Sequence, residues 1–223
     1  MDTPIRLMTS NLLHGGADVD AFVEVLDRLK PDVVVTQELG FEYVEVLTER
    51  YSNHYLNPAE DFTGRGIATH LEAVFGDIPM PVRMGTSAAL DVSGTEWNLA
   101  GIHLINPIEF PWWTSVKTRS GQLEAIDHWS LTVKEPSIVA GDFNASPKWP
   151  AYRHMAEDRT DVVAEHLSES DERPGRTWGW RPGWPRLLRI DHVFGSGVIA
   201  IEVSVVPIKG SDHDAVVVDL VTA

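Results

Sequence analysis

The chain has 223 residues, no cysteine and a formal net charge of −15 from 33 acidic and 18 basic side chains. Without cysteine there can be no disulfide, thiolate metal site or cysteine nucleophile, so oxygen or nitrogen atoms must hold any metal. The acidic balance argues against a protein that binds long duplex DNA through a broad basic face.

The first part of the chain alternates between strand and helix patterns. Residues 5–13 form a run typical of a strand, and apolar residues then recur at helical spacing over residues 19–29. The β-branched run at residues 32–39 predicts another strand, and residues 41–51 predict another helix. Residues 64–81 contain glycines and prolines, which favour short strands and turns.

The second part of the chain continues this alternation. Residues 95–107 predict a strand, residues 117–133 a helix, and residues 136–147 a buried strand that runs into a turn. The last predicted strands are residues 186–197, 200–208 and 214–221. This order of elements predicts an α/β fold, and the length suits one domain over residues 1–223.

Polar side chains able to bind a cation or a phosphate stand at the ends of the apolar runs. They are Asn11, Glu38, His103, Asp142 with Asn144, and Asp191. A rigid sheet fixes the groups at its strand ends, and the loops there give a substrate access. Each residue also has a structural interpretation as a cap or a turn, but their shared position favours one common site.

The segment GSDHDAVVVDL, residues 210–220, places Asp212 and His213 directly before an apolar strand. Gly-Ser-Asp is ordinary turn chemistry, and charged residues before a strand are commonly solvated. Taken alone, the segment therefore favours a turn over a site.

The motifs together, in this order, resemble the endonuclease/exonuclease/phosphatase family, with its deoxyribonuclease-I-like fold, across essentially the whole chain. They are SNLLHGG at Asn11, VVVTQEL at Glu38, AGIHLINP at His103, VAGDFNASP at Asp142 and Asn144, RIDHVF at Asp191, and GSDHDAVVVDL at Asp212 and His213. Gly-Asp-x-Asn and Ser-Asp-His before a strand are the most specific. The resemblance implies a four-layer α/β/β/α sandwich of two mixed β-sheets faced by helices, which agrees with the predicted elements.

The resemblance also implies a metal site. Glu38 would be the direct ligand of a divalent ion, with Asn11 beside it and Asp212 linked to the same ion directly or through water. Carboxylate and amide oxygens suit Mg²⁺, which keeps several waters, and Mn²⁺ may substitute for it.

The other motif residues are implied to carry the chemistry. Asp142 would orient or deprotonate the attacking water, and Asn144 would donate to that water or to a phosphate oxygen. His213 would face the phosphate with its ring held by Asp191, and His103 would be a second donor to the phosphate. His192 is expected on the opposite strand face as a structural residue. No role is assigned to Asp214 or to His14, His54, His70, His128, His154 and His166.

Segment 173–190 combines arginine and tryptophan without a single acidic residue. Placed just before Asp191, it is expected to overhang the pocket, where Arg176 and Arg181 bind phosphate and Trp180 stacks on a base or covers an apolar group. The alternative is a loop whose tryptophans pack into the core and whose arginines are merely solvated.

Segment 107–119, PIEFPWWTSVKTR, is expected to be a proline-flanked loop with an apolar rim near the site. Trp112 and Trp113 belong to this rim together with Phe110, and Arg119 would reach a phosphate from the following helix. Such a rim could equally contact a neighbouring subunit.

The function expected from these features is metal-dependent hydrolysis of a phosphodiester or phosphomonoester by in-line attack of an activated water. The substrate would be a small molecule, a lipid-like phosphate or a single-stranded nucleic acid. One alternative is a Mg²⁺-dependent nuclease acting on DNA or RNA, either non-specific or repair-linked. Another is a non-catalytic binding module that kept the fold.

The sequence also gives an expectation about location. No apolar run approaches the roughly 18 residues of a membrane span. A strand predicted from Ile5 leaves no room for a signal peptide. We therefore expect a cytoplasmic protein without a transmembrane segment.

Overall fold

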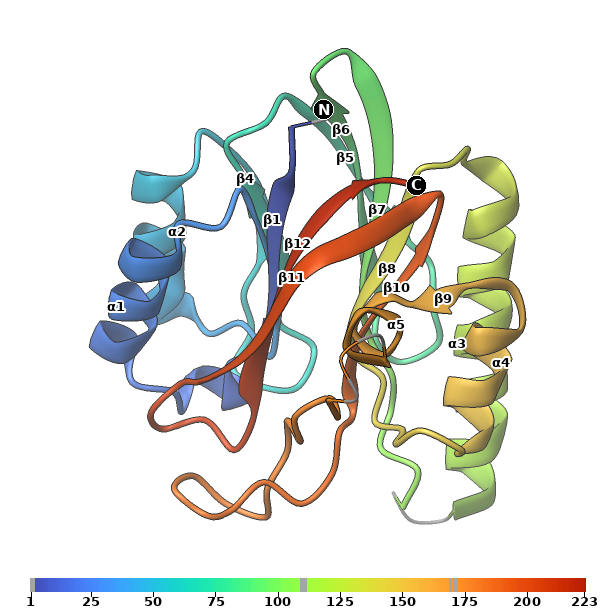
Figure 1. The fold of residues 1–223 in the computed structure, drawn as a ribbon. Helices are drawn as coiled ribbons and strands as arrows, with labels where there is room; N and C mark the ends of the chain where they lie inside the picture. The colour runs from blue at the N-terminus through green and yellow to red at the C-terminus, as the bar shows by residue number, and fades with distance from the viewer. Residues whose placement is uncertain (1–2, 109–111, 169, 171) are drawn as a thin grey trace.

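Two six-stranded β-sheets lie face to face between helices in the computed structural model (Figure 1). The structure describes residues 3–108, 112–168, 170 and 172–223. Both sheets contain parallel and antiparallel pairs. The predicted sandwich of two mixed sheets faced by helices is therefore confirmed.

The first sheet contains the first and the last strand of the chain. Its strands, in spatial order, are β11 (Val198–Pro207), β12 (Asp214–Thr222), β1 (Ile5–Asn11), β2 (Val33–Gln37), β4 (Arg65–Thr69) and β3 (Asn53–Asn57). β1 runs parallel to β2 and antiparallel to β12. The last residues of β1 and β2 consequently lie at the same sheet edge as the first residue of β12.

The second sheet repeats this arrangement. Its strands, in spatial order, are β5 (Ala73–Ile78), β6 (Gly85–Val92), β7 (Thr95–His103), β8 (Ser137–Asp142), β10 (Asp191–Ser196) and β9 (Thr160–Asp161). β7 and β8 are parallel with His103 opposite Asp142, and antiparallel β10 places Asp191 opposite the same residue. Three of the predicted catalytic side chains therefore share one edge.

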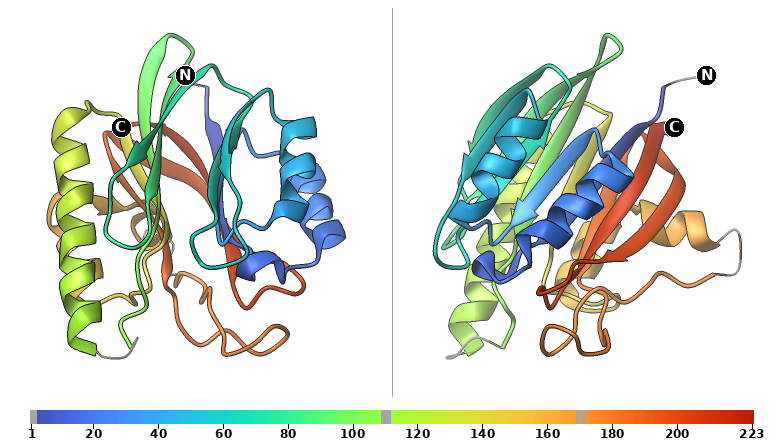
Figure 2. Two further views of the ribbon diagram at one scale, coloured as in Figure 1. Left: turned by 180° about the vertical axis from the view of Figure 1, so that it is seen from behind. Right: turned by 90° about the vertical axis from the view of Figure 1, so that its left-hand side faces the viewer.

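Helices cover the outer faces of both sheets. α1 (Val19–Leu29) and α2 (Val44–Arg50) lie on one side of the molecule, and α3 (Trp112–Thr132) and α4 (Pro150–Asp158) lie on the opposite side (Figure 2). α5 (Val162–Ser168) packs against β10 and β11. Two short 3-10 helices complete the described elements: η1 (Leu13–Gly15) follows β1, and η2 (Phe41–Tyr43) precedes α2. No helix in the described ranges is long and apolar enough to cross a membrane.

The apolar core between the sheets explains why β2 is a continuous β-branched run. Val33 and Val35 belong to the cluster between the sheets, whereas Val34 packs with α1 and α2 on the other face. Gly101 on β7 faces Val35, and a Cβ there would lie 2.7 Å from Val35 Cγ1. Glycine is thus required at residue 101 because the two sheets approach closely.

The structure departs from the sequence-based expectation at several elements. The sequence patterns do not predict β3, β6, β9, α4 or α5. β3 is a half-exposed edge strand without clean alternation, β9 has two residues, and both helices are short. The helix expected from residue 117 begins at Trp112. The expectation that Trp112 and Trp113 stand on a loop is therefore wrong, and a proline directly before them suits a helix start. Phe110 lies outside the described residues.

Candidate active site

The side chains predicted for catalysis and metal binding converge at one edge of the two sheets. A cleft of about 440 Å³ opens there between the strand ends. Its polar lining includes Glu38, His103, Asp142, Asn144, Asp212 and His213. Asn11 and Asp191 lie directly behind this lining and bond to it. The turn before β12 thus lets neighbouring Asp212 and His213 line the same cleft.

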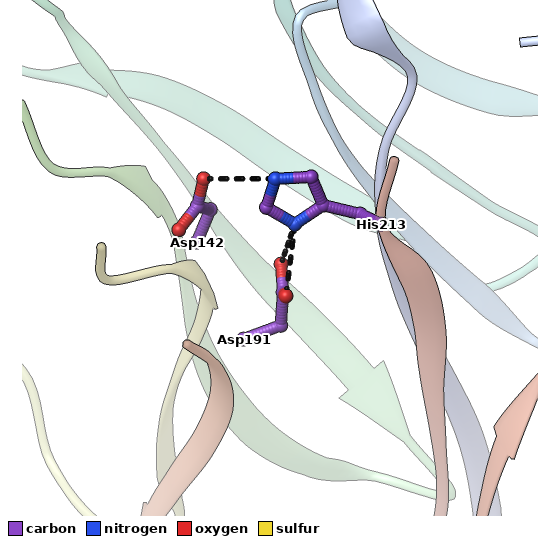
Figure 3. Close-up of side chains that lie close together, drawn as sticks. All are labelled: Asp142, Asp191 and His213. Carbon is purple, nitrogen blue, oxygen red and sulfur yellow. Dashed lines mark hydrogen bonds and ion pairs between the residues drawn. The ribbon is translucent and has the colours of Figure 1, made fainter. Parts of the chain in front are cut away.

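His213 lies between two buried carboxylates (Figure 3). Its Nδ1 is 2.9 Å from Asp191 Oδ2, and its Nε2 is 3.8 Å from Asp142 Oδ2. Burial disfavours the charged ring, but the Asp191 and Asp142 carboxylates outweigh burial and raise the pKa of His213 to about 10. The ring is therefore a cation at neutral pH.

Asp142 is the anionic counterpart of this cation. Burial opposes ionisation, but the charge of His213 and the contact with His103 outweigh it and hold the pKa of Asp142 below its usual range. The ligand-capable atoms of Asp142, Asp191 and His213 lie within 4.8 Å of one another. Because both ring nitrogens face carboxylates, the protonated ring already supplies the positive charge that a metal would bring to this cluster.

Asn11 links the two sheets. Its Nδ2 donates to Glu38 Oε1 at 3.1 Å and to Asp142 Oδ2 at 3.2 Å, and its Oδ1 accepts from the backbone N–H of Leu13 at 3.0 Å. The amide nitrogen therefore orients both carboxylates, and a metal contact by Asn11 would use the remaining lone pair of Oδ1.

Glu38 and Asp212 are the residues that best fit a divalent cation. Glu38 Oε2 and Asp212 Oδ1 are buried, and neither accepts a well-directed hydrogen bond within the described part of the chain, although His14 Nδ1 lies 2.9 Å from Glu38 Oε2. The second oxygen of Asp212 accepts from Trp178 Nε1 at 3.2 Å. Buried carboxylate oxygens of this kind in one cleft are the donors that a hard cation prefers.

The pKa values of these two carboxylates are shifted in opposite directions. Burial raises the pKa of Asp212, His213 opposes this rise, and the nearby charge of Glu38 adds to it. For Glu38, burial acts in the same direction, but contacts with His14 and His103 outweigh it and hold the pKa of Glu38 below its usual range. The charge of Glu38 therefore makes ionisation of Asp212 harder, a repulsion that a bound cation would relieve.

Two cationic or ionisable side chains of the cleft were missed by the sequence analysis. His14 Nδ1 lies 2.9 Å from Glu38 Oε2. Buried Arg83 contacts the Nε2 of His103 and donates to the carbonyl of Leu104 at 3.1 Å. No sequence pattern assigns a role to His14, and Arg83 lies between predicted helices and strands. The sequence therefore does not indicate either contact.

His103 and Asn144 adjoin Asp142 from the second sheet. His103 Nε2 is 3.4 Å from Asp142 Oδ2 and 3.7 Å from Glu38 Oε1. The backbone N–H of Asn144 donates to Asp142 Oδ1 at 2.7 Å, and its Nδ2 donates to the Leu104 carbonyl at 3.0 Å. Asp142 and Asn144 thus form the turn considered from sequence and also line the cleft.

Arg119 lies beneath the cleft. Its guanidinium donates to the carbonyls of Ile105 and Phe143, which follow the last residues of β7 and β8. Burial lowers the pKa of Arg119 to about 10, and the charge of Asp142 opposes this shift. The structure therefore brings Arg119 to the loop backbones behind the site, and its predicted contact with a phosphate stays a prediction.

The arginines of segment 173–190 divide into two groups. Arg186 and Arg189 point inward, Arg186 to the carbonyls of Ser211, Asp212 and His213 and Arg189 to Asp161. Arg186 also forms a salt bridge with Asp214, in which Nη2 lies 2.6 Å from Oδ1. This salt bridge gives a structural role to Asp214, to which the sequence assigned none. Arg176 and Arg181 are exposed, and Arg181 lies over the Trp184 ring.

The tryptophans of this segment border a second pocket. Figure 1 shows the segment, in orange, below the lower edge of the sheets. Trp178 and Trp180 line a pocket of about 220 Å³ together with Ile108, Trp149, Leu188 and Ile190. This pocket shares Asn106, Ile108, Asn144 and Trp178 with the cleft, and Trp180 is 60% exposed. Trp178 and Trp180 are therefore neither buried in the core nor away from the site.

The remaining aromatic prediction concerns α3. Trp113 is exposed in the first turn of this helix, and it does not line either pocket within the described residues. The side chain of Trp112 is outside the described part. His192 is fully buried and contacts the Ala145 carbonyl, as expected for a structural residue.

Residues 8–213 match the model of the Endonuclease/Exonuclease/phosphatase family. The chain belongs to this family. Members of the endonuclease/exonuclease/phosphatase family depend on divalent metals and hydrolyse phosphoesters, so the chain is a hydrolase that acts on ester bonds. No curated protein matches the chain significantly.

Solved structures share the fold at low sequence identity. D. rerio TDP2 complexed with a single-strand DNA product is 18% identical, with a TM-score of 0.77 over 99% of this chain and 100% of that one. The human Nocturnin catalytic domain with a bound sulfate anion is 20% identical, with a TM-score of 0.72 over 100% and 97%. The 3′ phosphatase NExo from Neisseria, bound to a product DNA hairpin, is 18% identical, with a TM-score of 0.68 over 96% and 98%.

Proposed function

We propose that the chain hydrolyses a phosphodiester or phosphomonoester of a single-stranded nucleic acid or a small nucleotide, with Mg²⁺ or Mn²⁺ as its cofactor. One observation carries this proposal. The buried carboxylates of Glu38 and Asp212 and the positively charged ring of His213 line one cleft. Phosphoryl transfer requires cations on the phosphate oxygens and an oriented nucleophile, and the cleft offers groups for both.

Glu38 and Asp212 would hold the cation, with Asn11 orienting Glu38. When bound, a divalent ion supplies positive charge to the phosphate oxygens. The chain's own contribution is to fix two carboxylates that would otherwise repel each other, one of them through the hydrogen bond from Asn11.

Asp142 would orient or deprotonate the attacking water. Its Oδ2 already accepts from Asn11, and its Oδ1 accepts from the Asn144 backbone, so the carboxylate is held in one orientation. The low pKa of Asp142 keeps it ionised at neutral pH, which makes it an acceptor for a water proton. Asn144 would donate to the same water or to a phosphate oxygen.

His213 would stabilise the charge that develops on the phosphate. The ring enters the reaction as a cation, and Asp191 holds its Nδ1 and fixes its orientation. His103 would be a second donor on the β7 side of the cleft. A donor fixed in advance in a buried site stabilises an anionic transition state without reorganisation.

The pocket beside the cleft supports a substrate with a base. Trp178 and Trp180 meet with ring centroids 5.7 Å apart, and aromatic side chains bind bases by stacking without sequence preference. Among the similar structures, TDP2 holds a single-strand DNA product and NExo a product DNA hairpin. A net charge of −15 argues against long duplex DNA as the preferred substrate.

The test is a substrate screen with the purified full chain. Single-stranded oligonucleotides, plasmid DNA, chromogenic phosphodiesters and phosphomonoesters, and a lipid phosphate are each incubated with Mg²⁺, Mn²⁺ or chelator. We expect metal-dependent turnover that chelator abolishes, with single strands cleaved faster than plasmid. If no phosphoester is cleaved with either metal, a non-catalytic binding module becomes the better account.

Replacing Trp180 by alanine tests the base pocket. Base stacking on an aromatic side chain contributes about 1–3 kcal/mol, so KM for an oligonucleotide is expected to rise about tenfold with kcat nearly unchanged. A phosphoester without a base should be cleaved as before. Trp184→Ala is the matched control, because Trp184 is 56% exposed and does not line the pocket in the described structure. Equal effects of both variants on KM would remove the pocket from the substrate path.

A further inference from the structure

His14 and Glu38 present two buried atoms to each other at the edge of the cleft. Nδ1 of His14 lies 2.9 Å from Oε2 of Glu38. Despite this closeness, neither atom makes a well-directed hydrogen bond within the described residues. Both atoms are therefore available to a common partner. Adjacent ligands of one octahedral ion with bonds of about 2.1 Å lie about 3 Å apart, which matches the observed separation.

The surroundings of His14 hold its ring in place. Phe62 packs edge-on against it with ring centroids 4.3 Å apart. This contact limits rotation of the ring and so helps to fix the direction of Nδ1.

The backbone around His14 is also shaped for this position. Leu13 and His14 both have left-handed conformations, with φ of 52° and 50°, which non-glycine residues rarely adopt in succession. Asn11 Oδ1 accepts from the Leu13 N–H, so the residue that orients Glu38 through its nitrogen also fixes the turn that carries His14. The imidazole and the carboxylate are thus positioned by one side chain.

We propose that His14 Nδ1 and Glu38 Oε2 bind the same divalent cation, which gives this site a nitrogen ligand and a preference for Mn²⁺ over Mg²⁺. Imidazole suits transition metals, whereas Mg²⁺ prefers oxygen ligands throughout. The inference rests on the proposed function, because it concerns the cation of that same site.

Pulsed electron paramagnetic resonance of the Mn²⁺-loaded full chain tests the nitrogen ligand directly. Wild-type protein should show the hyperfine coupling of a coordinated imidazole nitrogen to Mn²⁺. His14→Ala should abolish this coupling and weaken Mn²⁺ binding in calorimetry by about tenfold or more, with a smaller change for Mg²⁺. His128→Ala, an exposed histidine on α3, is the control and should behave as wild type.

A second variant separates ligation from folding of the turn. Asparagine tolerates left-handed backbone, so His14→Asn should keep the turn and the melting temperature but lose the nitrogen coupling. Absence of the coupling in wild type, its persistence in both variants, or failure of wild type to bind Mn²⁺ would overturn the proposal.

Phosphoester turnover measured on the same samples separates this inference from the proposed function. Turnover without nitrogen coupling would remove His14 as a ligand and leave the phosphoesterase in place. Coupling without turnover of any phosphoester would keep the ligand and overturn the proposed activity.

Discussion

His213→Ala is expected to lower kcat by about 10³-fold, equivalent to about 4 kcal/mol of transition-state stabilisation. The protonated ring lies between the Asp191 and Asp142 carboxylates and contacts both. Its removal leaves the phosphate without this cation and leaves the two buried carboxylates without their shared positive partner. Steady-state kinetics on the substrate found in the screen measure the change.

The folding cost of this substitution has to be measured separately. An uncompensated buried charge destabilises a protein by several kcal/mol, so His213→Ala should also lower the melting temperature. His213→Gln keeps a hydrogen-bond donor of similar reach but cannot carry the charge, and it should lose nearly as much activity with a smaller loss of stability. His128→Gln on the exposed face of α3 is the control. Near-normal kcat in either His213 variant would remove this residue from catalysis.

The motif residues could be located from sequence because strand ends impose their own geometry. Asp142 ends β8 and Asp191 begins β10, and the pairing register sets them directly opposite each other. Once two neighbouring strands are recognised, polar residues at their ends have to share an edge. The convergence of Asn11, Glu38 and Asp212 follows from the same argument in the other sheet.

His14 escaped this reasoning because its position depends on a turn rather than on a strand. It follows β1 in η1, and only its left-handed backbone directs the ring toward Glu38. A histidine followed by two glycines gives no periodicity from which such a contact could be inferred. Arg83 is a similar case, since it precedes β6 in a segment without a pattern and reaches His103 by folding alone.

The arginine and tryptophan segment shows a different limit. Arg176, Arg181 and Arg186 are equivalent by composition, yet only Arg186 reaches the turn at residues 211–213. The cause is a β-bridge between Trp178 and His213, which lays the segment along the turn and gives Arg186 its carbonyl partners. Pairing between segments so distant in sequence cannot be inferred from composition.

Glu38→Gln is expected to abolish metal-dependent turnover, with a loss of at least about 10³-fold, while leaving the fold intact. The pKa of Glu38 lies below its usual range, so wild-type protein presents a full negative charge to a cation at neutral pH. Glutamine has the same shape and keeps one oxygen, but it lacks that charge. Affinity for Mg²⁺ and Mn²⁺ should therefore fall by about 10²-fold in calorimetry, and the rise in melting temperature on adding metal should disappear.

Glu49→Gln is the matched control, because Glu49 is an exposed carboxylate on α2 and the substitution changes the net charge equally. A general effect of net charge on metal or substrate would appear in both variants, whereas loss of a ligand appears only in Glu38→Gln. Retained metal affinity together with lost turnover would assign Glu38 to the chemistry instead of the cation. Retained affinity and turnover would contradict a cation site at Glu38.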